Sequence, residues 1–151
     1  MDKQKSTKKM EIKFPVAARY LRDSQMPDTM RWYPEYAWAI MHEGSVMGTA
    51  GIFAGGWYSE LGSLWVHESI REKGWGKKLT KARVDYLCEN RERFPDLMIS
   101  RPSNAPSKRS LVSLGFRPTE IYDEFVGGDR IYVAYIHELC GTHIGRHMRG
   151  D

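Results

Sequence analysis

The spacing of apolar and polar residues along the chain predicts both strands and helices. Strand-like runs lie at residues 10–14, 36–42, 46–53, 58–67 and 97–100, and further extended runs lie at 116–125 and 130–139. The turn Glu43-Gly44-Ser45 joins the second and third runs, so we expect these to form an antiparallel hairpin. The strand–helix–strand order between residues 58 and 100 fits a parallel pair and equally fits any mixed sheet.

Helical patterns lie between these runs. The first, at about residues 17–30, is weak and leads into a connection rich in Met, Pro and Asp. The second begins at a glycine turn and covers about residues 74–90, with apolar side chains three or four residues apart along one face. A cap at Ser103 or Asn104 and a stop at Gly115 predict the third. The whole pattern predicts an α/β fold.

Length and composition fit one folded domain. The chain has 151 residues, enough to bury a single core well. Hydrophobic residues make up 41% and charged residues 28%, which argues against disorder as the main state. We expect a disordered basic tail at residues 1–9, a folded domain at 10–140 and a disordered tail at 141–151.

The cysteines and the apolar runs bear on the compartment. Cys88 and Cys140 are too few for a disulfide framework and suggest a reducing environment. No apolar run approaches the roughly 18–20 residues of a membrane span, and the N-terminus lacks the apolar core of a secretory signal. The sequence therefore predicts a cytoplasmic protein with no membrane partner. Cys140, His143 and His147 resemble part of a metal-binding set, but a fourth ligand is missing and we expect no metal site.

The stretch from Leu64 to Lys81 carries the clearest chemical signal. A strand end and a short polar connection lead into a glycine turn that opens a helix. Such a turn directs free backbone N–H groups and the positive end of the helix dipole at one spot, which suits a phosphate group. Gly74 and Gly76 let the backbone approach an anion closely. Positive charge around the turn comes from Arg71, Lys73, Lys77 and Lys78.

Two blocks of the sequence resemble the GNAT superfamily of N-acyltransferases. The segment Arg71-Glu72-Lys73-Gly74-Trp75-Gly76 follows a strand that ends in Val66, and it is similar to the family's acyl-CoA motif Arg/Gln-x-x-Gly-x-Gly/Ala. The segment Asn104-x-x-Ser107-x-x-Ser110-Leu111-x-x-Leu114-Gly115-Phe116 is similar to the family's Asn-x-x-Ala-x-x-Leu-Tyr-x-x-Leu-Gly-Phe. The resemblance covers about residues 36–125.

The resemblance implies a GNAT-like α/β fold, a single domain in which helices flank a mixed, splayed sheet of six to seven strands. It also implies that acetyl-CoA, or another acyl-CoA, lies in the splay as the co-substrate. Its pyrophosphate would lie on the turn, and its pantetheine arm would run along the end of the preceding strand. The cofactor-binding residues implied in this way are Trp65, Val66, Arg71, Lys73, Gly74, Trp75, Gly76, Lys77 and Asn104.

Acyl transfer to an amine needs a base for the amine, a polarised carbonyl and an acid for the leaving thiolate. Glu60 is the first candidate base. It lies six residues before Val66 on the same strand face, where family members often place a catalytic carboxylate. A solvated charge at the start of a strand is an equally weighted alternative. His67 is the second candidate, but alternation puts it on the opposite face and favours a structural role.

The acid is the point where this chain departs from the family pattern. The family's Tyr aligns with Leu111, and a leucine cannot donate a proton. Ser110 is the candidate acid, and the alternatives are Ser107, Tyr122 and Tyr132. Two further alternatives are protonation by solvent and a fold that binds acyl-CoA without efficient acetylation.

The predicted function is that of an acyl-CoA-dependent N-acyltransferase, acetyl being the expected group. Its acceptor would be a small-molecule amine or a protein amine that attacks the thioester directly. The alternative is a nucleic-acid-associated protein of the same fold that binds or modifies DNA or RNA, which a net charge of +4 with basic termini would support. Aromatic residues before the motif could stack on bases, although core packing is the favoured interpretation. These residues are Trp32, Tyr33, Tyr36, Trp38, Trp57 and Tyr58.

Overall fold

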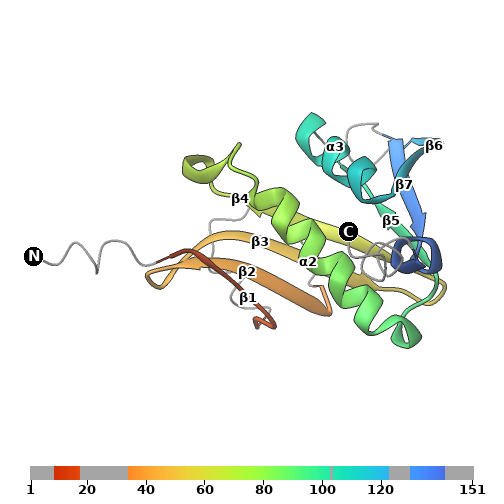
Figure 1. Cartoon of the computed structure of the whole chain (residues 1–151), viewed down its shortest axis with the longest axis horizontal. Coiled ribbons are helices and arrows are strands. Elements are labelled where there is room, and N and C mark those ends of the chain that lie inside the picture. The colour runs from red at the N-terminus through yellow and green to blue at the C-terminus, as the bar shows by residue number, and fades with distance from the viewer. Residues whose placement is uncertain (1–8, 18–33, 103, 123–129, 142–151) are drawn as a thin grey trace, which may run out of the picture.

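The computed structural model describes residues 9–17, 34–102, 104–122 and 130–141 (Figure 1). Within these residues, seven strands form one sheet in the order β1-β2-β3-β4-β5-β7-β6. The β4–β5 pair is parallel and the other neighbouring pairs are antiparallel. The predicted mixed α/β sheet is therefore confirmed. The strands are β1 (Glu11–Lys13), β2 (Tyr36–His42), β3 (Ser45–Ala54), β4 (Tyr58–Val66), β5 (Leu97–Ser100), β6 (Arg117–Tyr122) and β7 (Arg130–Tyr135).

Two longer helices pack beside this sheet. Helix α2 (Trp75–Glu89) lies obliquely across β2, β3 and β4, and helix α3 (Ala105–Leu114) lies near β5, β7 and β6 (Figure 1). Short 3₁₀ helices, η2 (Glu68–Ile70) and η3 (Arg91–Arg93), flank α2 in the chain. Both ends of α3 follow the predicted chemistry. The Asn104 side chain accepts a hydrogen bond from the Ser107 N–H at 2.9 Å and caps α3, and Gly115 ends it with a φ of 113°.

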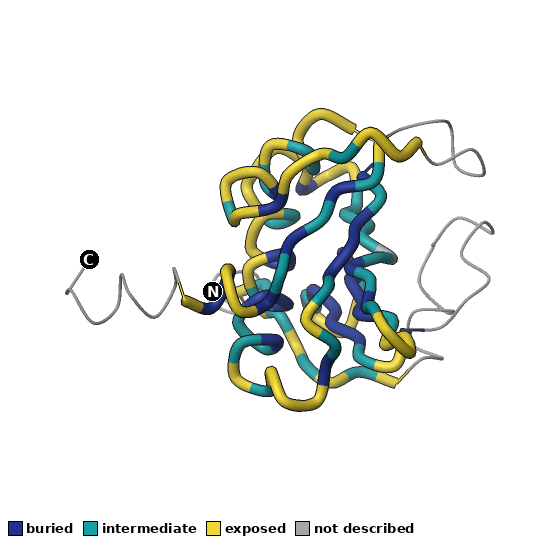
Figure 2. Tube along the Cα trace, turned by 90° about the vertical axis from the view of Figure 1, so that its right-hand side faces the viewer, coloured by how far each residue is buried: buried dark blue, intermediate teal, exposed yellow. Residues whose placement is uncertain are grey.

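The core lies between the sheet and the helices that pack on it. Its fully buried members come from central strands, from one stripe of α2 and from the helical segment 136–141, and Figure 2 shows buried residues in dark blue concentrated along the strands. Burial of these apolar side chains is the main force that holds α2 to the sheet. The largest of them are Ile40, Ile52, Leu61, Leu79, Leu87, Met98 and Ile136.

A group of aromatic rings closes one side of the core. Phe14 stacks on Trp38 with ring centroids 4.1 Å apart, and Tyr36 and Tyr86 are 5.3 Å apart. Core packing therefore explains Tyr36 and Trp38, and this was the interpretation that the sequence favoured. Trp57 differs, because 73% of its surface is exposed at the turn between β3 and β4. Trp32 and Tyr33 lie outside the described residues.

The last predicted strand is wrong beyond residue 135. Strand β7 ends at Tyr135, and residues 136–141 are helical. Asp96 explains the change, because it takes the first N–H groups of the new helix. Its backbone carbonyl accepts from the Ile136 N–H at 2.7 Å, and its carboxylate accepts from the His137 N–H at 2.9 Å. The cap comes from residues about 40 positions away, so a local pattern could not reveal it.

The cysteine interpretation also needs correction. Cys88 on α2 and Cys140 in the helical segment 136–141 form a disulfide, so the argument for a reducing environment loses its basis. The two residues are 52 positions apart, and only the fold brings them together. Because Cys140 is paired in this way, its thiol is not available to the metal set considered with His143 and His147, which lie outside the described residues.

Several predictions fall on parts of the chain that the structure does not describe. These are the helix at about residues 17–30, the end of the extended run at 116–125, and nearly all of the two predicted tails. Among the described residues, none of the helices has the length and apolar character that a membrane span requires.

Candidate active site

The sheet divides between β4 and β5. These strands pair in parallel only from Tyr58 and Leu97 to Leu61 and Ser100. Beyond Leu61, β4 continues to Val66 and pairs with β3 alone among the described strands. The Ser100 hydroxyl donates to the Leu61 carbonyl at 3.0 Å and closes the last step of the paired part. Within the part of the chain that the structure describes, the end of β4 therefore presents a free backbone edge, which can pair with an extended ligand.

A bulge accompanies this division. Gly51 of β3 faces Gly62, whereas Thr49 faces Trp65, so β4 carries an extra residue over this short stretch. A bulge bends its strand and interrupts the regular alternation of side chains. The alternation predicted from residue 58 to residue 67 consequently holds for buried Ser59 and Leu61 and is lost further along.

The glycine turn lies between the end of β4 and the start of α2. Gly74 adopts a φ of 87° as the N-cap, and its carbonyl accepts the first bond of the helix, from the Lys78 N–H at 3.0 Å. In the described structure no side chain caps this helix, so the N–H groups of residues 75–77 have no helical acceptor. A Cβ added to Gly76 would meet only Val66 Cγ2, at 4.0 Å. The turn thus offers open space and backbone donors, which suits the pyrophosphate of an acyl-CoA.

Basic side chains surround the turn. Arg71, Lys73, Lys77 and Lys78 are all exposed. Arg71 Nε donates to the Val66 carbonyl at 2.9 Å and ties the turn to the end of β4. Lys78 Nζ lies 4.3 Å from the centre of the Trp75 ring. The positive charge expected from the sequence is therefore concentrated where an anion would bind.

Glu60 stands at the last steps of the parallel pair. It faces Ile99, one residue before the Leu61–Ser100 step, and 24% of its side chain is exposed. Arg101 is the first residue after β5, and its Nε lies 3.4 Å from Glu60 Oε1. Arg101 was not among the residues predicted from the sequence. A charged residue directly after a buried parallel strand was the available signal, since ligands bind at the carboxyl ends of such strands.

The candidate acids lie in different environments. Leu111 is buried in the core and Ser110 beside it is half-buried. The Ser110 carbonyl accepts from the Ser113 hydroxyl at 2.8 Å. Tyr132 is buried and faces Ser100 across the β5–β7 pair, at the end where β4 and β5 separate. Tyr122 is half-exposed on the edge strand β6, where its hydroxyl accepts from Arg130 Nε at 3.3 Å.

His67 has local partners. Its Nδ1 lies 2.8 Å from the Ser69 hydroxyl and accepts from the Ser69 N–H at 3.0 Å, so the ring caps η2. The backbone N–H of His67 donates to the Met47 carbonyl at 2.7 Å. These contacts give His67 a structural role in the connection between β4 and the glycine turn.

A buried arginine of helix α2 donates hydrogen bonds to the backbone at the bulge. Arg83 on α2 is 2% exposed, and its Nη1 donates to the carbonyls of Gly51 and Gly62 at 3.2 Å each. Burial lowers the pKa of Arg83 to about 9, so the guanidinium still carries its charge at neutral pH. Arg83 was not among the residues predicted from the sequence, although it lies midway between Leu79 and Leu87 on the buried stripe.

Comparison with known proteins gives one family. A sequence model described as the Acetyltransferase (GNAT) family matches residues 9–116, which is well over half of the chain. No match was found among curated proteins.

Solved structures of similar fold are numerous. The chain is similar to the ribosomal-protein-S18-alanine N-acetyltransferase from Escherichia coli, with a TM-score of 0.63, 17% identity, and coverage of 85% of this chain and 94% of that one. It is similar to Ard1 from Thermoplasma volcanium, with a TM-score of 0.63, 16% identity, and coverage of 83% and 97%. It is also similar to the N-acetyltransferase YhbS from Escherichia coli in complex with CoA, with a TM-score of 0.59, 17% identity, and coverage of 87% and 85%. At these identities the likeness shows a shared fold.

Proposed function

The chain belongs to the GNAT acetyltransferase family, and from this premise we propose that it is an N-acyltransferase that transfers an acetyl group to an amine. The co-substrate in this family is an acyl-CoA, which supplies the thioester. The observation that carries the proposal is the free edge of β4 beside the uncapped, basic glycine turn. One feature suits an extended arm and the other suits a pyrophosphate, as an acyl-CoA requires.

We assign the binding residues accordingly. The turn would hold the pyrophosphate through backbone N–H groups of Trp75, Gly76 and Lys77, with Gly74 shaping the turn and Arg71 and Lys73 adding charge. Trp65 and Val66 would line the pantetheine arm. Asn104 caps α3 through its side-chain oxygen in the described structure, so we expect any contact with the cofactor to involve its amide nitrogen.

Glu60 is the proposed general base. The acceptor enters as an ammonium ion and passes one proton to the Glu60 carboxylate, which leaves a neutral nitrogen. That nitrogen forms a bond to the acyl carbon while the carbon–sulfur bond breaks, and the electron pair of the broken bond leaves with sulfur. The second proton of the nitrogen neutralises the thiolate, either through solvent or through Ser110. The products are the amide, free CoA and one released proton.

The nucleic-acid alternative has no specific support. It depends on basic termini that lie almost entirely outside the described residues, and two of the solved structures named above are N-acetyltransferases by their descriptions. Cytoplasmic location also stays a proposal, and the Cys88–Cys140 disulfide weakens the argument that first suggested it.

Two measurements test the proposed function. Calorimetric titration should show acetyl-CoA binding with a dissociation constant on the order of tens of micromolar or lower, within the usual range for enzyme substrates. Release of free CoA thiol should then be measured with a panel of amines. Binding without thiol release for every amine would favour a protein that holds acyl-CoA without turnover. An absence of binding would contradict the proposal.

A further inference from the structure

One ion pair lies where β4 and β5 separate. Glu60 and Arg101 come from the two strands that separate, one residue before the last paired step of β4 and one residue after the end of β5. Their side chains are 24% and 31% exposed, so both are largely shielded from solvent and still reachable. The two charges are therefore partly desolvated, which strengthens their interaction with a bound ligand.

The sheet does not depend on this pair for its stability. The parallel ladder and the Ser100–Leu61 hydrogen bond already hold the last paired step. The Nε–Oε1 distance of 3.4 Å exceeds the usual range for a strong N–H···O bond, and partly exposed ion pairs contribute little to folding. A ligand that offers each charge a better partner can therefore replace the contact at small cost.

We propose that Glu60 and Arg101 together select acceptors that carry a carboxylate next to the reactive amine, that is, α-amino acids and related small zwitterions. This inference rests on the proposed function and names its acceptor class. The ammonium group of the acceptor would contact Glu60, which then removes its proton as described above. Its carboxylate would contact the guanidinium of Arg101, whose planar fork matches a carboxylate.

The charges of an α-amino acid are spaced closely enough to lie alongside the Glu60–Arg101 pair. In an α-amino acid the nitrogen and the carboxyl carbon are about 2.5 Å apart, as standard backbone bond lengths require. The opposite charges of Glu60 and Arg101 are 3.4 Å apart at their nearest atoms. A zwitterion can therefore align head to tail with the pair, with its ammonium group toward Glu60 and its carboxylate toward Arg101.

Arg101 also disfavours the other acceptors considered. A protein lysine presents an ammonium with no carboxylate beside it, and so does the N-terminus of a long polypeptide. Each of these would bring its ammonium group to Glu60 beside the positive charge of Arg101 and would offer that charge no carboxylate, so it would gain one favourable contact instead of two.

The test uses the full chain, acetyl-CoA and pairs of acceptors that differ in one group. Each common amino acid is compared with its own carboxamide, and thiol release gives kcat/KM for both. For the preferred side chain, we expect the amino acid to exceed its amide by about tenfold to a hundredfold, which corresponds to a charge-assisted hydrogen bond. Arg101→Met should remove this preference, because it should lower the rate for the amino acid far more than the rate for its amide, and Arg101→Lys should restore part of it.

Arg117→Met is the matched control, because Arg117 is an exposed arginine on β6 whose ion-pair partner is Glu138. It should leave the preference intact. Acetyl-CoA affinity, measured for every variant, verifies that the site is folded. Equal rates for amino acids and amides in the wild type would overturn the inference, as would an equal loss of both rates in Arg101→Met. Failure of every amine to release thiol would overturn the proposed function itself, and the inference with it.

Discussion

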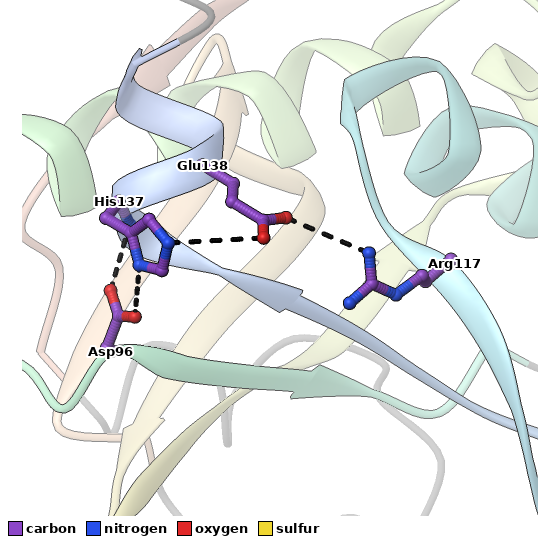
Figure 3. Close-up of polar contacts among 4 residues, drawn as sticks. All are labelled: Asp96, Arg117, His137 and Glu138. Atoms are coloured by element: carbon purple, nitrogen blue, oxygen red, sulfur yellow. Dashed lines mark hydrogen bonds and ion pairs between the residues drawn. The ribbon is translucent and has the colours of Figure 1, made fainter.

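The two ends of the β4–β5 pair are built in opposite ways. At the amino end, Asp96 holds the start of the helix at 136–141, and the Cys88–Cys140 disulfide ties that helix to α2. Figure 3 shows the ring of His137 against the carboxylate of Asp96 and shows Glu138 between His137 and Arg117. At the carboxyl end the strands separate after Leu61 and Ser100. One end is closed by cross-links and the other is left open.

The contrast indicates that the closed end stabilises the fold and the open end binds the ligand. An open sheet edge costs stability, because its backbone groups lack strand partners. The closed end can offset this cost and hold the strands so that the open end keeps a fixed geometry for a ligand. Changes at the closed end should therefore affect stability, and changes at the open end should affect binding and turnover.

Removal of the disulfide should give the largest change. In the double variant Cys88→Ala/Cys140→Ala, the free energy of unfolding should fall by about 4 kcal/mol, because a cross-link between residues 52 positions apart no longer restricts the unfolded chain. Chemical denaturation measures the effect. Acetyl-CoA affinity of the folded variant should equal that of the wild type.

The wild type treated with a reductant is the control for this variant. It should lose a comparable amount of stability, and the double variant should not respond to the reductant. A dissociation constant for acetyl-CoA more than about tenfold weaker, or 1.4 kcal/mol, would mean that the two ends are coupled.

Glu60→Gln should act at the open end alone. As a general base Glu60 is expected to contribute at least about a hundredfold to kcat, equivalent to about 2.7 kcal/mol. Acetyl-CoA affinity and unfolding should stay close to the wild type, because glutamine keeps the size of the side chain. Glu89→Gln, an exposed position on α2, is the control and should leave kcat unchanged. Equal losses of turnover and cofactor affinity would assign Glu60 a structural role.

Gly76→Leu should weaken acetyl-CoA binding without lowering stability. The added side chain would fill the space at the turn and weaken acetyl-CoA binding by about tenfold to a hundredfold, through loss of charge-assisted hydrogen bonds. Stability should hold or rise by up to about 1 kcal/mol, because glycine is a poor helix former and the new Cβ meets only Val66 at 4.0 Å. Calorimetry and thermal unfolding measure the two effects.

Gly74→Ala provides the contrasting control for the turn. Gly74 has open space around it but a φ of 87°, so alanine there is strained and should lower stability by about 1 kcal/mol. If Gly76→Leu binds acetyl-CoA as tightly as the wild type, the turn is not the pyrophosphate site.

The sequence predicted local features well because local chemistry determines them. Strands β2 to β5, helix α2 and the ends of α3 follow from apolar spacing, from the cap at Asn104 and from the stop at Gly115. The glycine turn follows from residues adjacent in the chain. The features it missed join distant segments: the Asp96 cap on the helix at 136–141, the disulfide, and the Glu60–Arg101 pair across two strands. Periodicity carries no information on such contacts.

Arg83 shows the same limit within a single helix. Its position on the stripe of Leu79 and Leu87 placed it toward the core, but its role depends on the carbonyls of Gly51 and Gly62. Those carbonyls lie where the register between β3 and β4 shifts, which is a feature of the strand pairing. A sequence pattern cannot report a hydrogen bond that only tertiary structure creates.

Asp96→Ala should give the smallest effect and test the closed end at its polar contact. Loss of a helix cap should lower the free energy of unfolding by about 1 kcal/mol at pH 7. Turnover and acetyl-CoA affinity should not change, because Asp96 lies at the opposite end of β5 from Arg101. Asp96→Asn keeps a capping oxygen without the charge, so its loss should be smaller than that of the alanine variant.

The pH dependence of this effect has a definite sign. Partial burial raises the pKa of Asp96, but hydrogen bonds from the backbone and ring of His137, with the charges of His137 and Arg91, outweigh it and leave the pKa below its ordinary value of 3.8. The unfolded chain therefore binds this proton more readily than the folded protein. The stabilisation is complete above the ordinary value and is lost as the pH falls through the lower folded value. Denaturation at a series of pH values should show the wild type and Asp96→Ala converging in acid, and a difference that grew on acidification would contradict this account.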